Sequence, residues 1–300
     1  MSDKGELPVS VISGQAILLV LLGMAVVLTI ILSILSRSVT DIAITSREEE
    51  ALRAFSAAEA GFERALIAGS SIPQTQIGDA SFTTSVSDFA QGVTGYNHPT
   101  SMVSGESAVL WYVAHNSNGD LECNSGAGLN CYTGDEMNVC WGKPGTPSGS
   151  ATTPAIEVSI YYAETPGDYS TVRVARDTAD PNAARTASNN FGSVDLGTCS
   201  VSGESYEFQK TIRYNDLGII SAVRNTENGL QFARIRMLYN TDTPQPFAVF
   251  LDNPIPSQGK RIESTGTSGE ATRRIVIFQT FSELPPIFDS AIFSSGDLTK

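Results

Sequence analysis

One uncharged stretch near the N-terminus constrains this chain more than any other feature. No charged residue occurs from Leu7 to Ser36, and the segment Gln15–Leu35 is almost wholly apolar. In an α-helix, about 21 residues rising roughly 1.5 Å each span the bilayer hydrocarbon core of about 30 Å. A secretory signal has a shorter apolar region with a small-residue cleavage site after it. No such site follows here, so we expect a retained, single-pass membrane anchor.

The helical pattern continues beyond the length that a membrane needs. No proline or glycine occurs between Met24 and Ala60. Gly69 followed by Pro73 is a typical stop signal. The apolar positions after the anchor recur at helical spacing: Leu35, Val39, Ile42, Leu52, Phe55, Ala58, Phe62 and Leu66.

Two interpretations of this stripe are open. In the first, it packs only on the chain's own domain, as in an ordinary amphipathic helix. In the second, which we favour, the helix divides its contacts. Gln15–Leu35 packs against other helices, and Phe55–Leu66 packs against the chain's own sheet.

The residues after the helix predict a β-rich domain. β-Branched and aromatic runs alternate with Gly, Asn, Pro and Ser clusters, which is typical of strands and turns. The expected fold class is α+β: a long N-terminal α-helix packed on a C-terminal antiparallel β-rich domain with long loops. The expected strands are 81–86, 108–114, 155–162, 170–174, 206–214, 232–239, 247–251, 261–264 and 274–281.

The expected boundaries follow from these patterns. Residues 1–14 form a leader, 15–35 the transmembrane half of the helix, 36–69 its amphipathic half, and 70–300 the extracytoplasmic globular domain. Residues 116–153 and 177–200 are expected to be long irregular loops. The Gly-Thr-Ser-Gly run at 266–269 is expected to form the tight turn of a closing hairpin.

Four cysteines all follow the anchor: Cys123, Cys131, Cys140 and Cys199. An even number of cysteines in a region expected outside the cytoplasm favours two disulfides over four reduced, buried thiols. Four cysteines allow three pairings, and the sequence alone does not choose among them. We favour Cys123–Cys131 with Cys140–Cys199, since the short-range pair leaves the long loop to the second bond. The Lys/Arg distribution around the anchor gives little orientation signal, so cysteine use supports the outside placement of the C-terminus.

Composition and motifs narrow the function classes. With 19 Lys+Arg against 32 Asp+Glu, the net charge is −13, which argues against nucleic acid as a partner. No catalytic or phosphate-binding motif occurs, so we expect neither an enzyme nor a cofactor. His98 and His115 lack an evident zinc set and are interpreted as structural or surface residues.

Two weaker candidate sites receive structural interpretations. The acidic loop residues Asp120, Glu122, Asp135 and Glu136 carry the oxygen ligands that calcium prefers, but without EF-hand spacing they are interpreted as solvated charge, and no metal site is predicted. The aromatic residues Trp111, Tyr112 and Trp141 are interpreted as core or loop anchors rather than sugar platforms.

The order of parts in the N-terminal third resembles a known family. A leader ends in Gly14, an apolar run begins at Gln15, Ser36-Arg37-Ser38 and three glutamates follow, and an AAEAG motif at 57–61 closes the module. This arrangement over residues 12–68 resembles type IV pilin-like proteins, and among them the PilX-like minor pilins and GspK-type pseudopilins.

The resemblance implies a life cycle for the chain. A prepilin peptidase would cut between Gly14 and Gln15, and an assembly platform would then move the subunit from the membrane into a filament. The helix-assembly positions implied are Leu18, Leu19, Leu22, Val26 and Thr29. Expected partners are other pilin-like subunits through their N-terminal helices, the peptidase, the platform and the membrane.

The sequence departs from the family pattern at two places. The fifth mature position is Leu19, where major pilins carry a glutamate; this fits a rare subunit at a tip or initiating complex better than a bulk subunit. The leader is not basic, and glutamine is an unusual first mature residue. The alternative function is a membrane-anchored surface binding protein or adhesin that does not polymerise.

Overall fold

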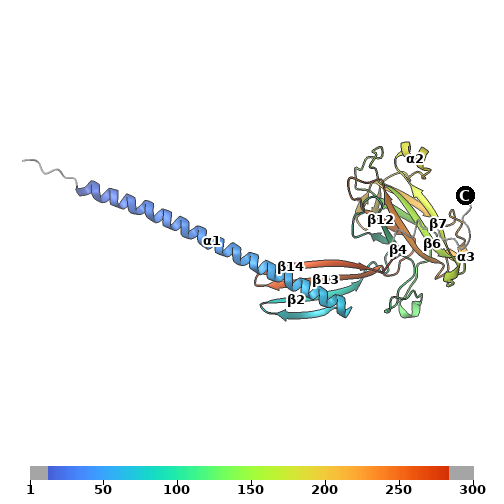
Figure 1. The fold of residues 1–300 in the computed structure, drawn as a ribbon, viewed down its shortest axis with the longest axis horizontal. Coiled ribbons are helices and arrows are strands. Elements are labelled where there is room, and N and C mark those ends of the chain that lie inside the picture. Colours follow the sequence, from blue (N-terminus) through green and yellow to red (C-terminus); the bar gives the residue numbers. More distant parts are fainter. Residues whose placement is uncertain (1–12, 284–300) are drawn as a thin grey trace, which may run out of the picture. The chain divides into compact units, whose positions relative to one another are not determined.

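The computed structural model describes residues 13–283, which divide into two compact units (Figure 1). Unit 1 comprises the described residues up to Ser85 together with Glu263–Val276. Unit 2 comprises Val86–Ile262 and the described residues from Ile277 onward. The chain therefore leaves unit 1 after Ser85, returns at Glu263 and leaves again after Val276, so that strands far apart in sequence share one sheet.

Unit 1 begins with a single continuous helix, α1 (Ser13–Ala68). At about 1.5 Å per residue it is roughly 80 Å long. The helix ends where the sequence predicts, since Gly69 has a positive φ of 63° and its N–H donates to the Ala65 carbonyl at 2.8 Å. Glycine adopts this left-handed conformation without steric cost, which is why it commonly follows the last helical residue.

The sheet of unit 1 has the order β1-β2-β13-β14. Its members are β1 (Ile72–Ile77), β2 (Ala80–Asp88), β13 (Gly259–Ser268) and β14 (Ala271–Thr280). The long strands β13 and β14 continue from unit 1 into unit 2. The C-terminal half of α1 lies alongside this sheet in Figure 1.

Helix α1 approaches the sheet through its smallest residues. Ala54, Ala57, Ala58, Gly61 and Ala65 are buried. The Ser264 hydroxyl donates to the Ala58 carbonyl at 2.6 Å, which joins strand to helix directly.

Glycines permit this approach. A Cβ added to Gly266 would lie 2.0 Å from the Ala54 carbonyl oxygen and 2.6 Å from the Ala58 nitrogen. A Cβ added to Gly61 would lie 2.5 Å from the Phe82 ring. The two elements therefore meet nearly backbone to backbone.

Unit 2 is built on two four-stranded antiparallel sheets. One has the order β10-β5-β12-β3 and the other β4-β11-β6-β7. Their bounds are β3 (Gly95–Asn97), β4 (Ser107–Trp111), β5 (Glu136–Trp141), β6 (Ala155–Ala163), β7 (Val172–Ala179), β10 (Phe208–Arg213), β11 (Leu230–Leu238) and β12 (Phe247–Leu251).

Alternate residues of both sheets join in one buried cluster, so the sheets form two layers around a shared core. Met137, Val139 and Trp141 enter it from β5, and Ile235 and Met237 enter it from β11. Side chains alternate between the faces of a strand, which explains why every second residue of these strands is in the core. The Trp141 Nε1 donates to the Pro154 carbonyl at 2.9 Å, so the largest core side chain is also hydrogen-bonded.

Shorter elements complete unit 2. The outer face of β5 and β12 is covered by the hairpin of β8 (Cys199–Val201) and β9 (Glu204–Tyr206) through a small cluster containing Cys140, Cys199 and Ala248. The helices are α2 (Ala183–Asn189), α3 (Ser221–Arg224), η1 (Ser125–Ala127) and η2 (Tyr169–Thr171).

The α+β class is confirmed at the level of a long apolar helix followed by antiparallel sheets, but the long loops are not. Residues 116–153 contain β5, a central strand buried on both faces, and 177–200 contain α2 and the start of β8. The closing turn is also shifted: Gly266–Ser268 belong to β13, and the reversal occurs at Gly269 and Glu270. The polar composition of residues 116–153 misled the prediction because β5 is short and the residues on both sides of it form loops.

Candidate helix-assembly surface

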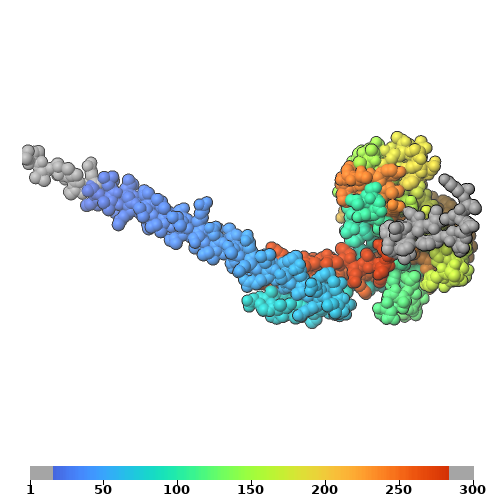
Figure 2. All heavy atoms as spheres, viewed as in Figure 1, coloured from blue at the N-terminus to red at the C-terminus, as the bar shows by residue number. Residues whose placement is uncertain are grey.

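Large apolar side chains cover α1 far beyond the length of a membrane span. Among the described residues, one helix, Ala16–Ala68, is long and apolar enough to span a membrane. Its most apolar stretch is not buried against the rest of the chain. Figure 2 shows its N-terminal part without other chain segments around it. The exposed apolar residues after the anchor are Val39, Ile42, Ile44, Leu52, Phe55, Leu66 and Ile67.

The sequence prediction for the C-terminal half was therefore wrong in part. Phe55 and Leu66 were expected against the sheet, yet their exposed fractions are 44% and 39%. Only Ala58 and the half-buried Phe62 of that stripe turn inward. The helix face that contacts the sheet consists of alanine and glycine instead, because the close backbone approach leaves no room for larger side chains.

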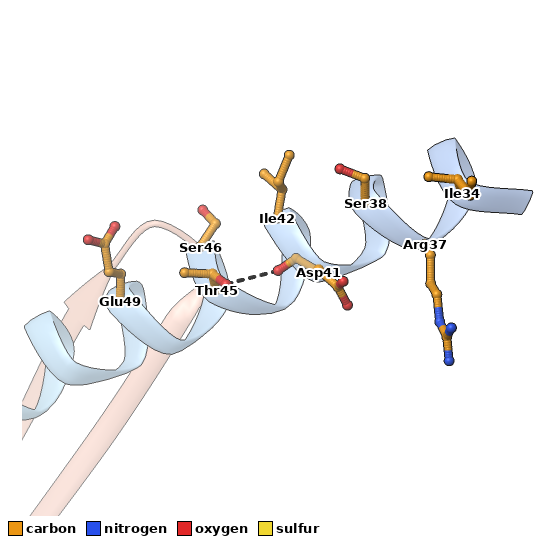
Figure 3. Close-up of a pocket in the computed structure, with 8 residues that line it drawn as sticks. All are labelled: Ile34, Arg37, Ser38, Asp41, Ile42, Thr45, Ser46 and Glu49. Carbon is orange, nitrogen blue, oxygen red and sulfur yellow. Dashed lines mark hydrogen bonds between the residues drawn. The ribbon is translucent and has the colours of Figure 1, made fainter. Parts of the chain in front are cut away.

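A hollow lies along α1 just after the anchor, between Ile34 and Glu49 (Figure 3). Ser38, Ile42 and Ser46 point to one side of the helix, and Arg37 points to the other. Residues four apart share a helix face, so this face alternates small hydroxyls with a branched apolar side chain. Such a surface allows another helix to approach closely.

The polar residues of this helix satisfy one another locally. The hydroxyls of Thr29, Thr40 and Thr45 donate to the carbonyls of Val26, Ser36 and Asp41 at 2.7 to 2.9 Å. Arg53 forms an ion pair with Glu49 at 2.9 Å. These three hydroxyls are therefore paired within the helix, while the exposed apolar side chains of the same stretch, such as Val39 and Ile42, have no partner of their kind on the chain's own sheet.

The positions predicted for helix assembly are all exposed on the N-terminal half of α1. Leu18, Leu19, Leu22 and Val26 are 66%, 66%, 59% and 52% exposed, and Thr29 is exposed as well. The processing residues Gly14 and Gln15 lie in the first turn of α1. The rest of the predicted leader, residues 1–12, lies outside the described residues.

Both disulfides are formed, in the pairing that we favoured. Cys123–Cys131 closes a loop with a sequence separation of 8, and Cys140–Cys199 closes one of 59. The second bond is buried and fastens the β8–β9 hairpin to β5. No free cysteine exists, which makes any introduced cysteine the sole reactive thiol.

The histidines of unit 2 occupy aromatic surroundings. His98 stacks on Phe247 with ring centroids 4.7 Å apart, and its Nδ1 lies 3.0 Å from the Tyr96 hydroxyl. His115 stacks on Phe281 at 3.7 Å. Burial lowers the pKa of each histidine to about 4, so both imidazoles are neutral at pH 7.

A cluster of buried tyrosines joins the same unit. The hydroxyls of Tyr112 and Tyr214 lie 3.0 Å apart, and Tyr132 donates to Asp252 at 2.6 Å. Burial raises the pKa of all three tyrosines well above the ordinary value, so they stay protonated. Trp141 and Tyr112 are core residues as interpreted, and Trp111 is half-buried.

The acidic loop residues do not converge. Among residues 13–283, no group of three His, Cys, Asp or Glu side chains is placed to hold a metal ion. Asp135 instead accepts a hydrogen bond from Arg224 at 2.6 Å, which holds the pKa of that carboxyl below its usual value.

Comparisons with protein-family models, with curated proteins and with solved structures found no match to this chain. The sequence prediction missed the helical spacing of small residues within 54–65. Alanine and glycine, rather than the large apolar residues, share the buried face of the helix. Counting alanine and glycine as the buried stripe, instead of leucine and phenylalanine, would have found it.

Proposed function

We propose that this chain is a structural subunit of the minor pilin or pseudopilin kind, which waits in a membrane through α1 and then packs that helix against others in a type IV pilus-like or secretion filament. The observation that carries the proposal is the exposed apolar surface of α1 beyond Leu35. Lipid covers about 20 helical residues, and the sheet takes only the small ones. Val39, Ile42, Leu52 and Phe55 would otherwise face water.

Energetics favour a protein partner for these positions. Burying a large aliphatic or aromatic side chain is worth about 1.5–3 kcal/mol relative to leaving it exposed. Helices that leave lipid need another apolar environment, and neighbouring helices supply one through close packing of small and branched side chains. The resemblance of residues 12–68 to pilin-like proteins supports the same conclusion.

A place at a filament tip or in an initiating complex suits Leu19. An apolar residue at this depth is stable in the membrane, whereas an ionised carboxylate there is costly. The membrane-waiting state therefore gains from leucine, at the expense of a polar contact that a bulk subunit would use.

The direct experiment places single cysteines along α1 of the full chain in living cells. Leu19→Cys, Val26→Cys and Ile42→Cys are expected to crosslink to neighbouring subunits, because these side chains are exposed and apolar. Glu63→Cys, at an exposed polar position, is the matched control and should react with soluble reagents only.

The N-terminus of the mature protein supplies the second readout. Mass spectrometry should find Gln15 as the first residue. An intact leader, together with crosslinks that never reach another subunit, would contradict the proposal and favour a non-polymerising anchored binding protein.

A further inference from the structure

A recess of unit 2 lies outside the helix-assembly surface. It has a volume of about 650 Å³, within the range of about 300–1,000 Å³ that small-molecule sites occupy. Four segments surround it: residues 88–92, 114–119, 128–130 and 254–260, with Phe281 beside them.

The walls of this recess are held in place before any ligand arrives. The Gly92 N–H donates to the Ile255 carbonyl at 2.9 Å, and the Gln258 N–H donates to the Phe89 carbonyl at 2.8 Å, which fixes the first segment against the last. The Cys123–Cys131 disulfide closes the loop that supplies residues 128–130. Preformed walls reduce the entropy lost on binding.

The 114–119 wall is organised by one amide side chain. The Asn116 Oδ1 accepts from the Asn118 and Asp120 N–H groups at 2.9 and 3.1 Å, and its Nδ2 donates to Glu122 at 3.1 Å. Asn116 thereby shapes the loop and presents Ser117 and Asn118, both exposed, at the recess.

The side chains around the recess carry no net charge. Its charged residues are Asp88 and Lys260, whose Oδ1 and Nζ lie 2.6 Å apart. His115 is neutral at pH 7 because burial lowers its pKa to about 4. An anion or a cation would therefore find no unbalanced partner here, and a charged ligand is disfavoured.

The remaining groups are suited to hydroxyls and to an apolar ring face. Gln91, Asn118 and Asn130 are exposed at the recess, and each amide both donates and accepts hydrogen bonds. The His115 Nδ1 is buried and has no hydrogen-bond partner among residues 13–283. Phe281, half-buried and backed by the His115 ring, provides a fixed aromatic plane.

We propose that this recess binds a neutral carbohydrate, with the C–H face of a sugar ring on Phe281 and its hydroxyls on the amides of Gln91, Asn118 and Asn130. A pyranose combines an apolar face with a rim of groups that donate and accept hydrogen bonds, as this recess requires. The site is independent of filament assembly, since all its residues belong to unit 2.

The test uses the full chain in phosphatidylcholine nanodiscs, because maltoside detergents carry a competing disaccharide. Saturation-transfer NMR is recorded with the methyl glycosides of glucose, galactose, mannose and N-acetylglucosamine, and with N-acetylneuraminic acid as a charged sugar. At least one neutral glycoside should receive saturation, and the charged sugar should bind less well.

Three variants locate the binding. Phe281→Ala should weaken the affinity for the bound glycoside by about tenfold or more, which is about 1.4 kcal/mol. Asn130→Asp, on an exposed loop, adds a charge without changing shape and should weaken it comparably. Phe250→Ala removes an exposed aromatic ring from β12, outside the recess, and should leave binding unchanged.

The proposal is overturned if no neutral glycoside in the panel receives saturation, if the charged sugar binds best, or if binding persists at full strength in both Phe281→Ala and Asn130→Asp.

Discussion

The helix–sheet contact of unit 1 and the two-layer core of unit 2 bury different kinds of side chain. In unit 1 the contact consists mainly of alanine and glycine, with Phe82 as its one large buried ring. In unit 2 the core is filled by Trp141, Tyr112, Phe247 and a set of aliphatic residues. The first contact brings backbones together, and the second fills a wide space between sheets.

The difference explains how one helix can contact the sheet closely and still expose large apolar side chains. A face of small residues packs closely on the sheet. This contact buries few of the large apolar side chains, which remain on the other faces of α1. In unit 2 most large apolar residues lie in the buried core, although Leu196 and Ile220 are exposed. The exposed leucines and isoleucines of α1 differ in that they follow one another along a single helix.

The largest expected effect lies in the core of unit 2. Trp141→Ala should lower the free energy of unfolding by about 3–5 kcal/mol, because it empties a fully buried site and leaves the Pro154 carbonyl without its donor. Denaturant unfolding followed by Trp111 fluorescence measures the loss. Phe250→Ala, half-exposed on β12, should cost far less. Equal losses for the two variants would show that unit 2 does not depend on its core as described.

Gly266→Val tests the backbone approach in unit 1. Valine favours strands, but its Cβ would collide with the Ala54 carbonyl and the Ala58 nitrogen, so a loss of about 3 kcal/mol is expected. Hydrogen exchange of the amides in 54–65 should accelerate. Gly149→Val is the matched control, since its Cβ would meet nothing within 4 Å. Unchanged exchange in the Gly266 variant would rule out a backbone-to-backbone contact.

The pH dependence of stability should also differ between the two units, because both histidines lie in unit 2. The pKa values of His98 and His115 fall to about 4 in the folded protein, from 6.5. Above pH 6.5 both residues are neutral in either state. Between pH 6.5 and 4 the unfolded chain binds protons that the folded chain does not, so stability falls as pH falls.

This loss should appear in unit 2, which contains both histidines. Denaturant midpoints measured from pH 7 to 4 give the slope. The double variant His98→Gln with His115→Gln should flatten it relative to the natural chain. A slope that is the same in both proteins would assign the pH effect to other groups.

The smallest effect on stability is expected on the exposed face of α1. Ile42→Asn should change the free energy of unfolding by no more than about 0.5 kcal/mol, because Ile42 is 66% exposed. It should nevertheless reduce crosslinking from Val26→Cys to neighbouring subunits. Ser46→Asn, one turn further along the same face (Figure 3), introduces the same side chain in place of a small polar one. If both variants crosslink equally well, the apolar surface is not what partners recognise.

Parts of the fold could be predicted because their signals are local. The absence of charge from Leu7 to Ser36 and the Gly69 stop signal determined the helix and its end within a residue. Alternation in Ile156–Tyr161 determined β6. Cysteine number and spacing favoured the two disulfides that are formed.

Other parts could not be predicted, because they depend on residues distant in sequence. β5 is flanked by polar, cysteine-containing loops, and its central position becomes clear only when β10 and β12 pair with it. The recess of unit 2 is likewise lined by segments that lie between residues 88 and 281 in the sequence. No local sequence pattern predicts it.

The sequence by itself determined that a long apolar helix precedes a disulfide-containing β-rich region, since length, charge and periodicity are properties of neighbouring residues. Only the tertiary structure decided which face of that helix is buried against the sheet. Gly266, more than 200 residues after Ala54, admits the helix backbone to within contact distance. That close approach admits alanine and excludes leucine, and so it leaves the large apolar side chains of α1 exposed.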